Sequence, residues 1–146
     1  MTPMEIALAE ARDAGTRGEV PVGAVVLDGA GTVLARAGNE VEARRDASAH
    51  AELLALRTAA AVHGRTRLAD CDLVVTLEPC PMCAHASSLF RIRRLTFGAY
   101  DPKSGGVEHG ARVFAASSCH HRPEVIGGVC ESDAAALLQA FFAARR

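Results

Sequence analysis

Two short motifs carry side chains that could bind a metal and catalyse hydrolysis: His50-Ala51-Glu52 and Pro79-Cys80-Pro81-Met82-Cys83. One imidazole and two thiolates suit zinc, and a three-residue spacing on a helical turn places both sulfurs on one side. Three protein ligands leave the fourth position of a tetrahedral zinc ion to water, as in catalytic sites. Glu52 is near enough to exchange protons with that water without joining the ligands. The motifs therefore predict one Zn²⁺ held by His50, Cys80 and Cys83, with Glu52 as the catalytic residue.

Either motif alone would be ambiguous. A single C-x-x-C also occurs in redox pairs and as half of a structural zinc site, and a His-x-Glu at a helix start is often a surface pair. The two motifs together, each beside a predicted helix start and without a second C-x-x-C in the sequence, favour catalytic zinc. Adjacent residues seldom converge on one ion, so Cys119-His120-His121 is interpreted as a loop. Cys71 and Cys130 are predicted to be small buried hydrophobic residues.

Hydrophobic periodicity and turn residues predict the elements that position these motifs. Thr2-Pro3-Met4-Glu5 is typical of a capping box with proline at the first helical position. The run from Leu73 to Leu77 is typical of a short strand buried on both faces. The predicted elements are helices over 3–15, 49–61, 81–90 and 131–146, strands over 20–27, 32–37, 73–77, 95–99 and 125–126, and loops over 38–48 and 100–110. This order predicts a three-layer α/β domain around a mixed sheet, with both motifs at helix N-termini.

Length and composition limit the class of protein. A chain of 146 residues predicts a single domain, residues 1–146, and 49% hydrophobic with 23% charged residues is typical of a packed core. Residues 1–15 lack a basic start and a cleavage pattern, and no apolar run approaches the ~18 residues of a membrane span, so neither export nor membrane insertion is expected. Five cysteines, an odd number with one C-x-x-C, favour a reducing compartment, so a cytoplasmic location is expected.

The charges are distributed unevenly along the chain. The net charge is −1, yet residues 85–146 carry 8 basic and 5 acidic side chains. Their arginines cluster at Arg91, Arg93 and Arg94 and at Arg145 and Arg146. Such clusters either contact phosphates or form solvated faces and helix C-terminal partners, and charge alone leaves both interpretations open.

Several strings beyond the two motifs resemble one family: Glu19-Val20-Pro21-Val22-Gly23-Ala24-Val25, Gly38-Asn39, Thr76-Leu77-Glu78-Pro79-Cys80-Pro81-Met82-Cys83, Phe97-Gly98-Ala99 and Phe141-Phe142-x-x-Arg145-Arg146. Together with His50-x-Glu52 they make the chain similar to the zinc-dependent cytidine-deaminase superfamily. Within it, the chain resembles the bacterial tRNA-specific adenosine deaminases over nearly its whole length. It departs from their pattern at 84–88 and 105–109.

The resemblance implies a cytidine-deaminase-like α/β/α fold with a mixed, mostly five-stranded sheet and one Zn²⁺ per subunit of a homodimer. It implies binding of a tRNA anticodon stem-loop and hydrolytic conversion of the wobble adenosine to inosine. Asn39 and the Ala51 N–H would contact the base, and Asp101 and Lys103 the flanking nucleotides. The terminal residues implied to border RNA are Phe142, Arg145 and Arg146.

Three points refine these expectations. One phenylalanine of the pair Phe141 and Phe142 is expected in the core, because both lie on an amphipathic helix. Small and apolar residues beside the metal helix, namely Ala84, Ala86 and Leu89, are the candidate dimer surface. The alternatives are a cytosine or guanine deaminase acting on free bases or nucleosides, which needs no phosphate partners, and a non-enzymatic zinc-stabilised fold, which needs no Glu52.

Overall fold

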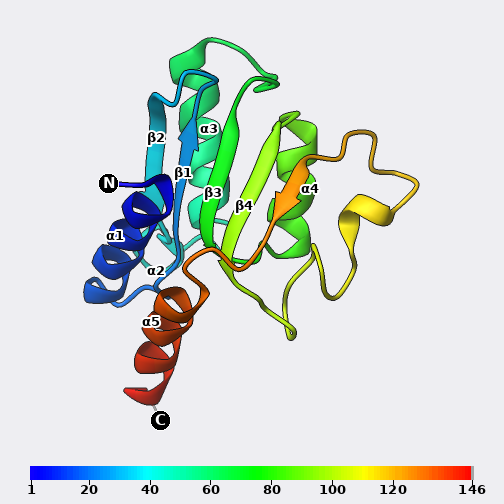
Figure 1. Ribbon diagram of the computed structural model, residues 1–146. Helices are drawn as coiled ribbons and strands as arrows, with labels where there is room; N and C mark the ends of the chain where they lie inside the picture. Colours follow the sequence, from blue (N-terminus) through cyan, green and yellow to red (C-terminus); the bar gives the residue numbers. More distant parts are fainter. Residues whose placement is uncertain (146) are drawn as a thin grey trace.

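The computed structural model describes residues 1–145, and a mixed sheet lies at its centre (Figure 1). The five strands are β1 (Gly23–Leu27), β2 (Val33–Gly38), β3 (Asp72–Leu77), β4 (Arg94–Ala99) and β5 (Glu124–Ile126). Their order in space is β2-β1-β3-β4-β5. Strand β1 is antiparallel to β2 and β3, whereas β3, β4 and β5 are parallel. The mixed five-stranded sheet is therefore confirmed.

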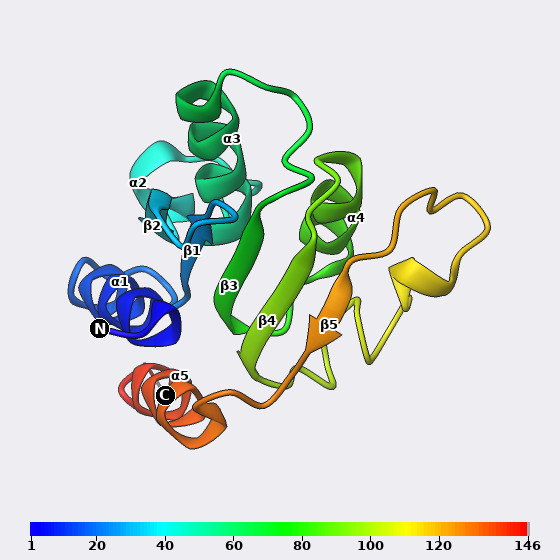
Figure 2. The same ribbon diagram turned by 45° about the horizontal axis from the view of Figure 1, so that its top comes forward.

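Two pairs of helices cover the two faces of this sheet, and Figures 1 and 2 show the layers from two directions. The helices are α1 (Pro3–Thr16) and α5 (Glu131–Ala143) on one face, and α3 (Ala51–His63) and α4 (Pro81–Leu89) on the other. The predicted three-layer α/β/α architecture is confirmed. Within residues 1–145, no helix is both long enough and apolar enough to cross a membrane.

Alternating side chains of the buried strands form two cores. Leu73 and Val75 of β3 face α3 and α4, whereas Val74 faces α1 and α5. Helix α1 packs so closely on the sheet that a Cβ atom at Gly23 would overlap the backbone carbonyl of Ala7. The N-termini of α3 and α4 meet near the carboxyl end of β3.

Local details differ in part from the prediction. The capping box of α1 is present, with the Glu5 N–H donating to Thr2 Oγ1 at 3.2 Å and the Thr2 N–H to Glu5 Oε1 at 2.9 Å. The predicted loop over 38–48 contains a short helix, α2 (Val41–Arg44), and a 3-10 turn, η1 (Val113–Ala115), precedes β5. Helix α5 ends earlier than predicted, so Arg145 follows the helix. Arg146 lies outside the described residues.

Candidate active site

The three predicted metal ligands meet where α3 and α4 begin. His50 is the N-cap residue of α3, Cys80 is that of α4, and Cys83 lies in the first turn of α4. The His50 Nδ1 atom is 3.5 Å from Cys80 Sγ and 3.6 Å from Cys83 Sγ. Zinc bonds of about 2.1 Å to nitrogen and 2.3 Å to sulfur separate tetrahedral ligand atoms by about 3.6 Å. The donor types and their separations therefore fit zinc.

The pKa values of the two thiols differ, and that of Cys80 favours metal binding. A hydrogen bond with Cys83 lowers the pKa of the Cys80 thiol to about 4, and His50 adds to this effect while burial opposes it. The same hydrogen bond, together with burial, raises the pKa of Cys83. The hydrogen bond to Cys80 also raises the pKa of His50. Cys80 thus favours the thiolate, which is the form that binds metals.

Glu52 lies in the first turn of α3, next to these ligands. The residue is only 4% exposed, and burial raises the pKa of its carboxyl group to about 7. A group with such a pKa can both accept and donate a proton near neutral pH. Glu52 lines the same cleft as His50 and Cys80. The site therefore combines three side chains that could hold a metal ion with a carboxyl group suited to proton transfer.

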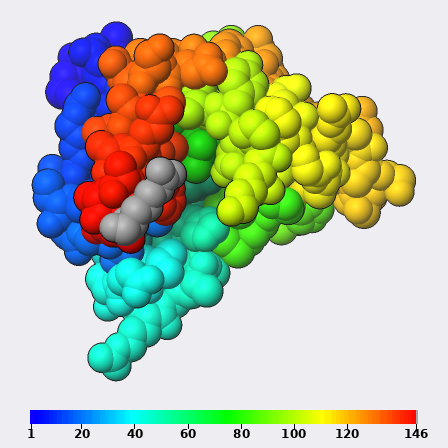
Figure 3. Space-filling view, turned by 90° about the horizontal axis from the view of Figure 1, so that it is seen from below, coloured from blue at the N-terminus to red at the C-terminus, as the bar shows by residue number. Residues whose placement is uncertain are grey.

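A cleft of about 580 Å³ opens over this cluster, within the usual size of small-molecule sites. Its walls come from the α1–β1 loop, α2, the start of α3, the end of β3, the segment after β4 and the end of α5. Figure 3 shows the hollow between α5 in red, α2 in cyan and the segment near residue 100 in yellow-green. The cleft is open to solvent, so a group presented on a larger molecule can enter it.

Asn39 and Ala51, two predicted substrate contacts, are hydrogen-bonded to each other. The Ala51 N–H donates to Asn39 Oδ1 at 2.8 Å, and Ala51 is completely buried. This N–H therefore already has a protein acceptor, which the sequence did not indicate. Asn39 lines the cleft, and because its oxygen is occupied, its amide nitrogen Nδ2 is the atom left for a ligand.

The predicted rim residues divide into two groups. Asp101 and Arg145 line the cleft, whereas Lys103 and Phe142 are exposed and do not line it. Phe141 lines the cleft instead, and the Arg145 guanidinium carbon lies 3.4 Å from the centre of its ring. The expectation that one phenylalanine is in the core is wrong, because Phe141 is half-buried and Phe142 is 49% exposed. The reason is that α5 packs on the sheet with its first turns, and its last turn extends past the strand ends.

Comparisons with known proteins agree with this geometry. Residues 2–99, which contain the three ligands and Glu52, match the family model of the cytidine and deoxycytidylate deaminase zinc-binding region. The chain belongs to this deaminase family. It is 54% identical over 144 residues to the tRNA-specific adenosine deaminase of Agrobacterium fabrum, covering 98% of this chain and 93% of the relative.

Solved structures give the same result for the fold of this deaminase. A structure from work on A-to-I editing by tRNA:A34 deaminases matches with a TM-score of 0.90 at 53% identity, covering 93% of this chain and 98% of the other. The guanine deaminase of Nitrosomonas europaea matches with a TM-score of 0.83 at 25% identity, covering 97% of this chain and 83% of the other. The resemblance inferred from the motifs is confirmed.

The arginine cluster at 91–94 does not face the deaminase cleft. Arg93 binds Asp72 through two hydrogen bonds of 3.0 and 2.8 Å, and Arg94 binds Glu124 at 2.8 Å. Asp72 and Arg94 are the first residues of β3 and β4, whereas the cleft lies at the opposite ends of these strands. These two arginines therefore pair with carboxylates of neighbouring strands, so the solvated-face interpretation fits them.

The candidate dimer surface of the deaminase also needs correction. Ala84 and Ala86 are buried inside the chain, because this side of α4 packs against the core. Leu89, in contrast, is 64% exposed, and Met82 on the same helix is 39% exposed. The apolar surface of α4 is therefore carried by Met82 and Leu89.

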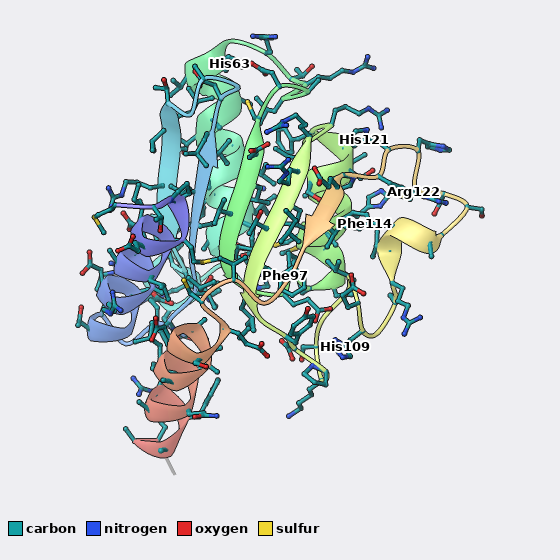
Figure 4. The ribbon with its side chains drawn as sticks, in the orientation of Figure 1. His63, Phe97, His109, Phe114, His121 and Arg122 are labelled. Carbon is teal, nitrogen blue, oxygen red and sulfur yellow. The ribbon has the colours of Figure 1, made fainter. Side chains whose placement is uncertain are left out.

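A second cluster of potential ligands, His63, Asp70 and Cys71, is a poor metal site. Arg65 places a guanidinium nitrogen 2.8 Å from His63 Nε2, which repels a cation there. Burial raises the pKa of the Cys71 thiol to about 12, so it stays protonated, and its predicted burial is confirmed. Figure 4 shows His63 at the end of the molecule opposite His109.

The remaining cysteines have no role in the site. Cys119 lies in a loop, as the sequence predicts, and its side chain is buried. Its sulfur is 3.4 Å from Ser88 Oγ of α4. The prediction that Cys130 is buried is wrong. It is exposed because it is the N-cap of α5, in a left-handed conformation with φ 54°.

Two buried acids of the cleft were missed in the sequence. Glu19 accepts hydrogen bonds from the N–H groups of Glu42 and Ala43 at 3.0 and 2.9 Å and so holds the start of α2. Glu78 accepts five hydrogen bonds from the segment that follows β4. The available signal was position: Glu19 directly precedes a stretch of apolar residues and Glu78 directly follows one, and burial there requires hydrogen-bond donors.

Proposed function

We propose that this chain is a zinc-dependent deaminase that hydrolyses adenosine to inosine at the wobble position of a tRNA anticodon loop. The observation that carries the proposal is the convergence of His50, Cys80 and Cys83 beside the buried carboxyl group of Glu52 in one open cleft. This combination is that of a catalytic site, since a purely structural zinc site needs neither an open cleft nor a proton carrier.

The residues divide the chemistry between them. Zinc held by the three ligands would supply a Lewis acid that lowers the pKa of its water toward neutrality. Glu52 accepts one proton of the attacking water and transfers it to ring N1 of adenine, while the oxygen adds at C6. Glu52 then takes the second proton from the new C6 hydroxyl and delivers it to the amine, the C6–N bond breaks, and adenosine and water have given inosine and ammonia. Asn39 Nδ2 would donate a hydrogen bond to the base.

An RNA substrate is supported by the relatives and by the shape of the cleft. The Agrobacterium fabrum relative is a tRNA-specific adenosine deaminase, and the match extends over almost the whole of both chains. The cleft is open, and its rim carries Arg145 stacked on Phe141, a pair that suits a phosphate or a nucleobase. With a tRNA substrate we propose a cytoplasmic location.

We propose a homodimer that pairs the exposed face of α4. Met82 and Leu89 expose apolar surface on α4, and a second subunit packed against this face would remove that surface from water. Light scattering at micromolar concentration should give about twice the 15.3 kDa chain mass. Leu89→Lys should shift the mass toward one chain, and an unchanged dimer would exclude this face.

The second candidate is a deaminase of free nucleobases, which the likeness to the guanine deaminase of Nitrosomonas europaea favours. One experiment separates the two candidates. The protein is incubated with an adenosine-wobble anticodon stem-loop and, separately, with free adenosine, cytosine and guanine. We expect inosine from the stem-loop alone. Formation of uracil or xanthine without inosine in the RNA would reject the proposed function.

A further inference from the structure

Glu78 is completely buried as a side chain, yet it belongs neither to the metal ligands nor to the proton carrier. It is two residues before Cys80 and lines the cleft. Its Oε1 atom accepts the Asp101 N–H at 3.0 Å and lies 2.8 Å from His109 Nδ1. Figure 4 shows His109 beyond the ends of β3 and β4. One carboxylate oxygen therefore joins two residues that are far apart in the segment after β4.

The other oxygen completes the attachment. Glu78 Oε2 accepts three successive N–H groups, from Val107 at 3.2 Å, Glu108 at 2.9 Å and His109 at 3.0 Å. Successive N–H groups aimed at one point form an anion-binding nest, and bonds to a carboxylate are stronger than neutral ones. Glu78 thus holds the start and the end of segment 101–109 on one buried group.

Close contacts show that this segment is fitted to the metal loop. The Gly106 N–H donates to the Pro79 carbonyl at 2.8 Å, and a Cβ atom at Gly106 would lie 2.5 Å from the Pro81 nitrogen. A Cβ atom at Gly105 would overlap Glu78 Oε2. The position of the segment is therefore set by the residues on either side of Cys80.

We propose that Glu78 is a positioning residue for the substrate: by holding both ends of segment 101–109, it sets the cleft wall formed by Asp101 and Ser104 relative to the metal ligands. This inference rests on the proposed RNA substrate, whose nucleotides next to the reacting base would contact that wall. Asp101 is the sensitive point, since its own carboxylate accepts the Ser104 N–H at 2.9 Å and shapes the turn at the rim.

Glu78→Gln tests the proposal with little change in volume. The glutamine amide keeps one acceptor oxygen, and we expect this oxygen to accept the three N–H groups of residues 107–109, since that orientation retains the most hydrogen bonds. Its NH₂ group then faces the Asp101 N–H, donor against donor, while His109 Nδ1 can act as an acceptor. We expect exchange of the Asp101 amide to accelerate about 12- to 150-fold, the effect of losing one hydrogen bond to a charged group, with smaller changes at 107–109.

Kinetics distinguish positioning from a merely structural role. For the stem-loop we expect KM to rise about tenfold while kcat stays within about threefold, with zinc retained. Glu108→Gln is the matched control, because it removes the same charge from an exposed side chain of the same segment. Glu108→Gln should leave the exchange rate of the Asp101 amide and kcat unchanged. If removal of a negative charge by itself increases RNA affinity, the increase is seen in Glu108→Gln as well as in Glu78→Gln.

Two further variants keep the test decisive if Glu78→Gln folds poorly. Gly105→Ala pushes against Glu78 Oε2 without any change of charge, and His109→Ala removes one of the five hydrogen bonds from a partly exposed side chain. Both should raise KM and Asp101 exchange, the second by less.

Three outcomes would overturn the proposal: folded variants with an unchanged KM, a fall in kcat at an unchanged KM, or loss of zinc from Glu78→Gln. A wild-type protein that deaminates a free base but not the stem-loop would instead reject the proposed function. In that case KM is measured with the free base that the protein deaminates. Amide exchange at Asp101 still tests whether Glu78 holds segment 101–109.

Discussion

Glu52→Gln separates catalysis from metal binding. Glu52 is 4% exposed beside His50 and Cys80, and glutamine has nearly the same shape, so the substitution leaves no cavity. An amide cannot take up the proton that the carboxyl group holds and releases. The water then loses its proton acceptor, ring N1 stays unprotonated and the amine leaves slowly.

The expected loss follows from the number of proton transfers. One positioned acid or base contributes about 10²–10⁴-fold, which is about 3–5 kcal/mol of barrier. In the proposed mechanism Glu52 serves at least two transfers, to N1 and to the amine, and burial raises its pKa to about 7, where both transfers are efficient. We therefore expect a loss of about 10⁴-fold or more in the chemical step, with RNA affinity preserved.

Single-turnover deamination of the stem-loop measures this step, with zinc content and RNA binding determined on the same samples. Glu131→Gln is the matched control: it makes the same chemical change on an exposed side chain in the first turn of α5, and its rate should stay within about twofold of wild type. A loss below tenfold with zinc retained would remove Glu52 from the mechanism. Loss of zinc would make it a ligand.

Three further outcomes are expected. Cys83→Ser should lose its zinc and melt at a lower temperature, since binding of the metal stabilises the fold. Cys71→Ser, at an equally buried position, is the control and should keep its zinc in elemental analysis. Full zinc in Cys83→Ser would refute the ligand set. Arg145→Ala should make the slope of log affinity for the stem-loop against log salt concentration shallower by about one phosphate contact, and Arg93→Ala should leave that slope unchanged. The same slope in both variants would limit Arg145 to a structural role. In native protein, maleimide should label the exposed Cys130 and spare Cys71, whose pKa is raised to about 12, as peptide mass mapping can establish.

The metal cluster could be predicted because its geometry is local. Each ligand lies at or directly after a helix start, and short signals mark those starts: a proline after Cys80, and a return of helical periodicity after His50. The apolar run of β3 indicated a strand buried on both faces, so a layer of helices on each face of the sheet could be predicted as well.

The rim could not be predicted because it depends on contacts between distant segments. Whether Phe141 or Phe142 faces the cleft depends on how α5 is rotated against the sheet, and both have the same hydrophobicity. The arginines at 93 and 94 are paired with Asp72 and Glu124 of adjacent strands, so their charge was no guide to an RNA surface. Helix α2 has no sequence signal of its own, because Glu19, more than 20 residues away, supplies the acceptors for its first N–H groups.

Three buried glutamates line this cleft, and they differ in the hydrogen bonds that their carboxyl groups accept. Glu19 is occupied by two backbone N–H groups of α2. Burial would raise the pKa of Glu78, yet the N–H donors around it outweigh burial and lower that pKa, so it stays an anion and holds a loop. At Glu52, in contrast, burial outweighs the hydrogen bonds from its own backbone N–H and from Cys83, and it raises the pKa to about 7. Many donors keep a buried carboxyl group charged, whereas a buried carboxyl group with fewer donors exchanges protons near neutral pH. Glu78 is therefore a fixed anion in the cleft wall and Glu52 an acid that titrates near neutral pH, a distinction that residue types alone do not contain.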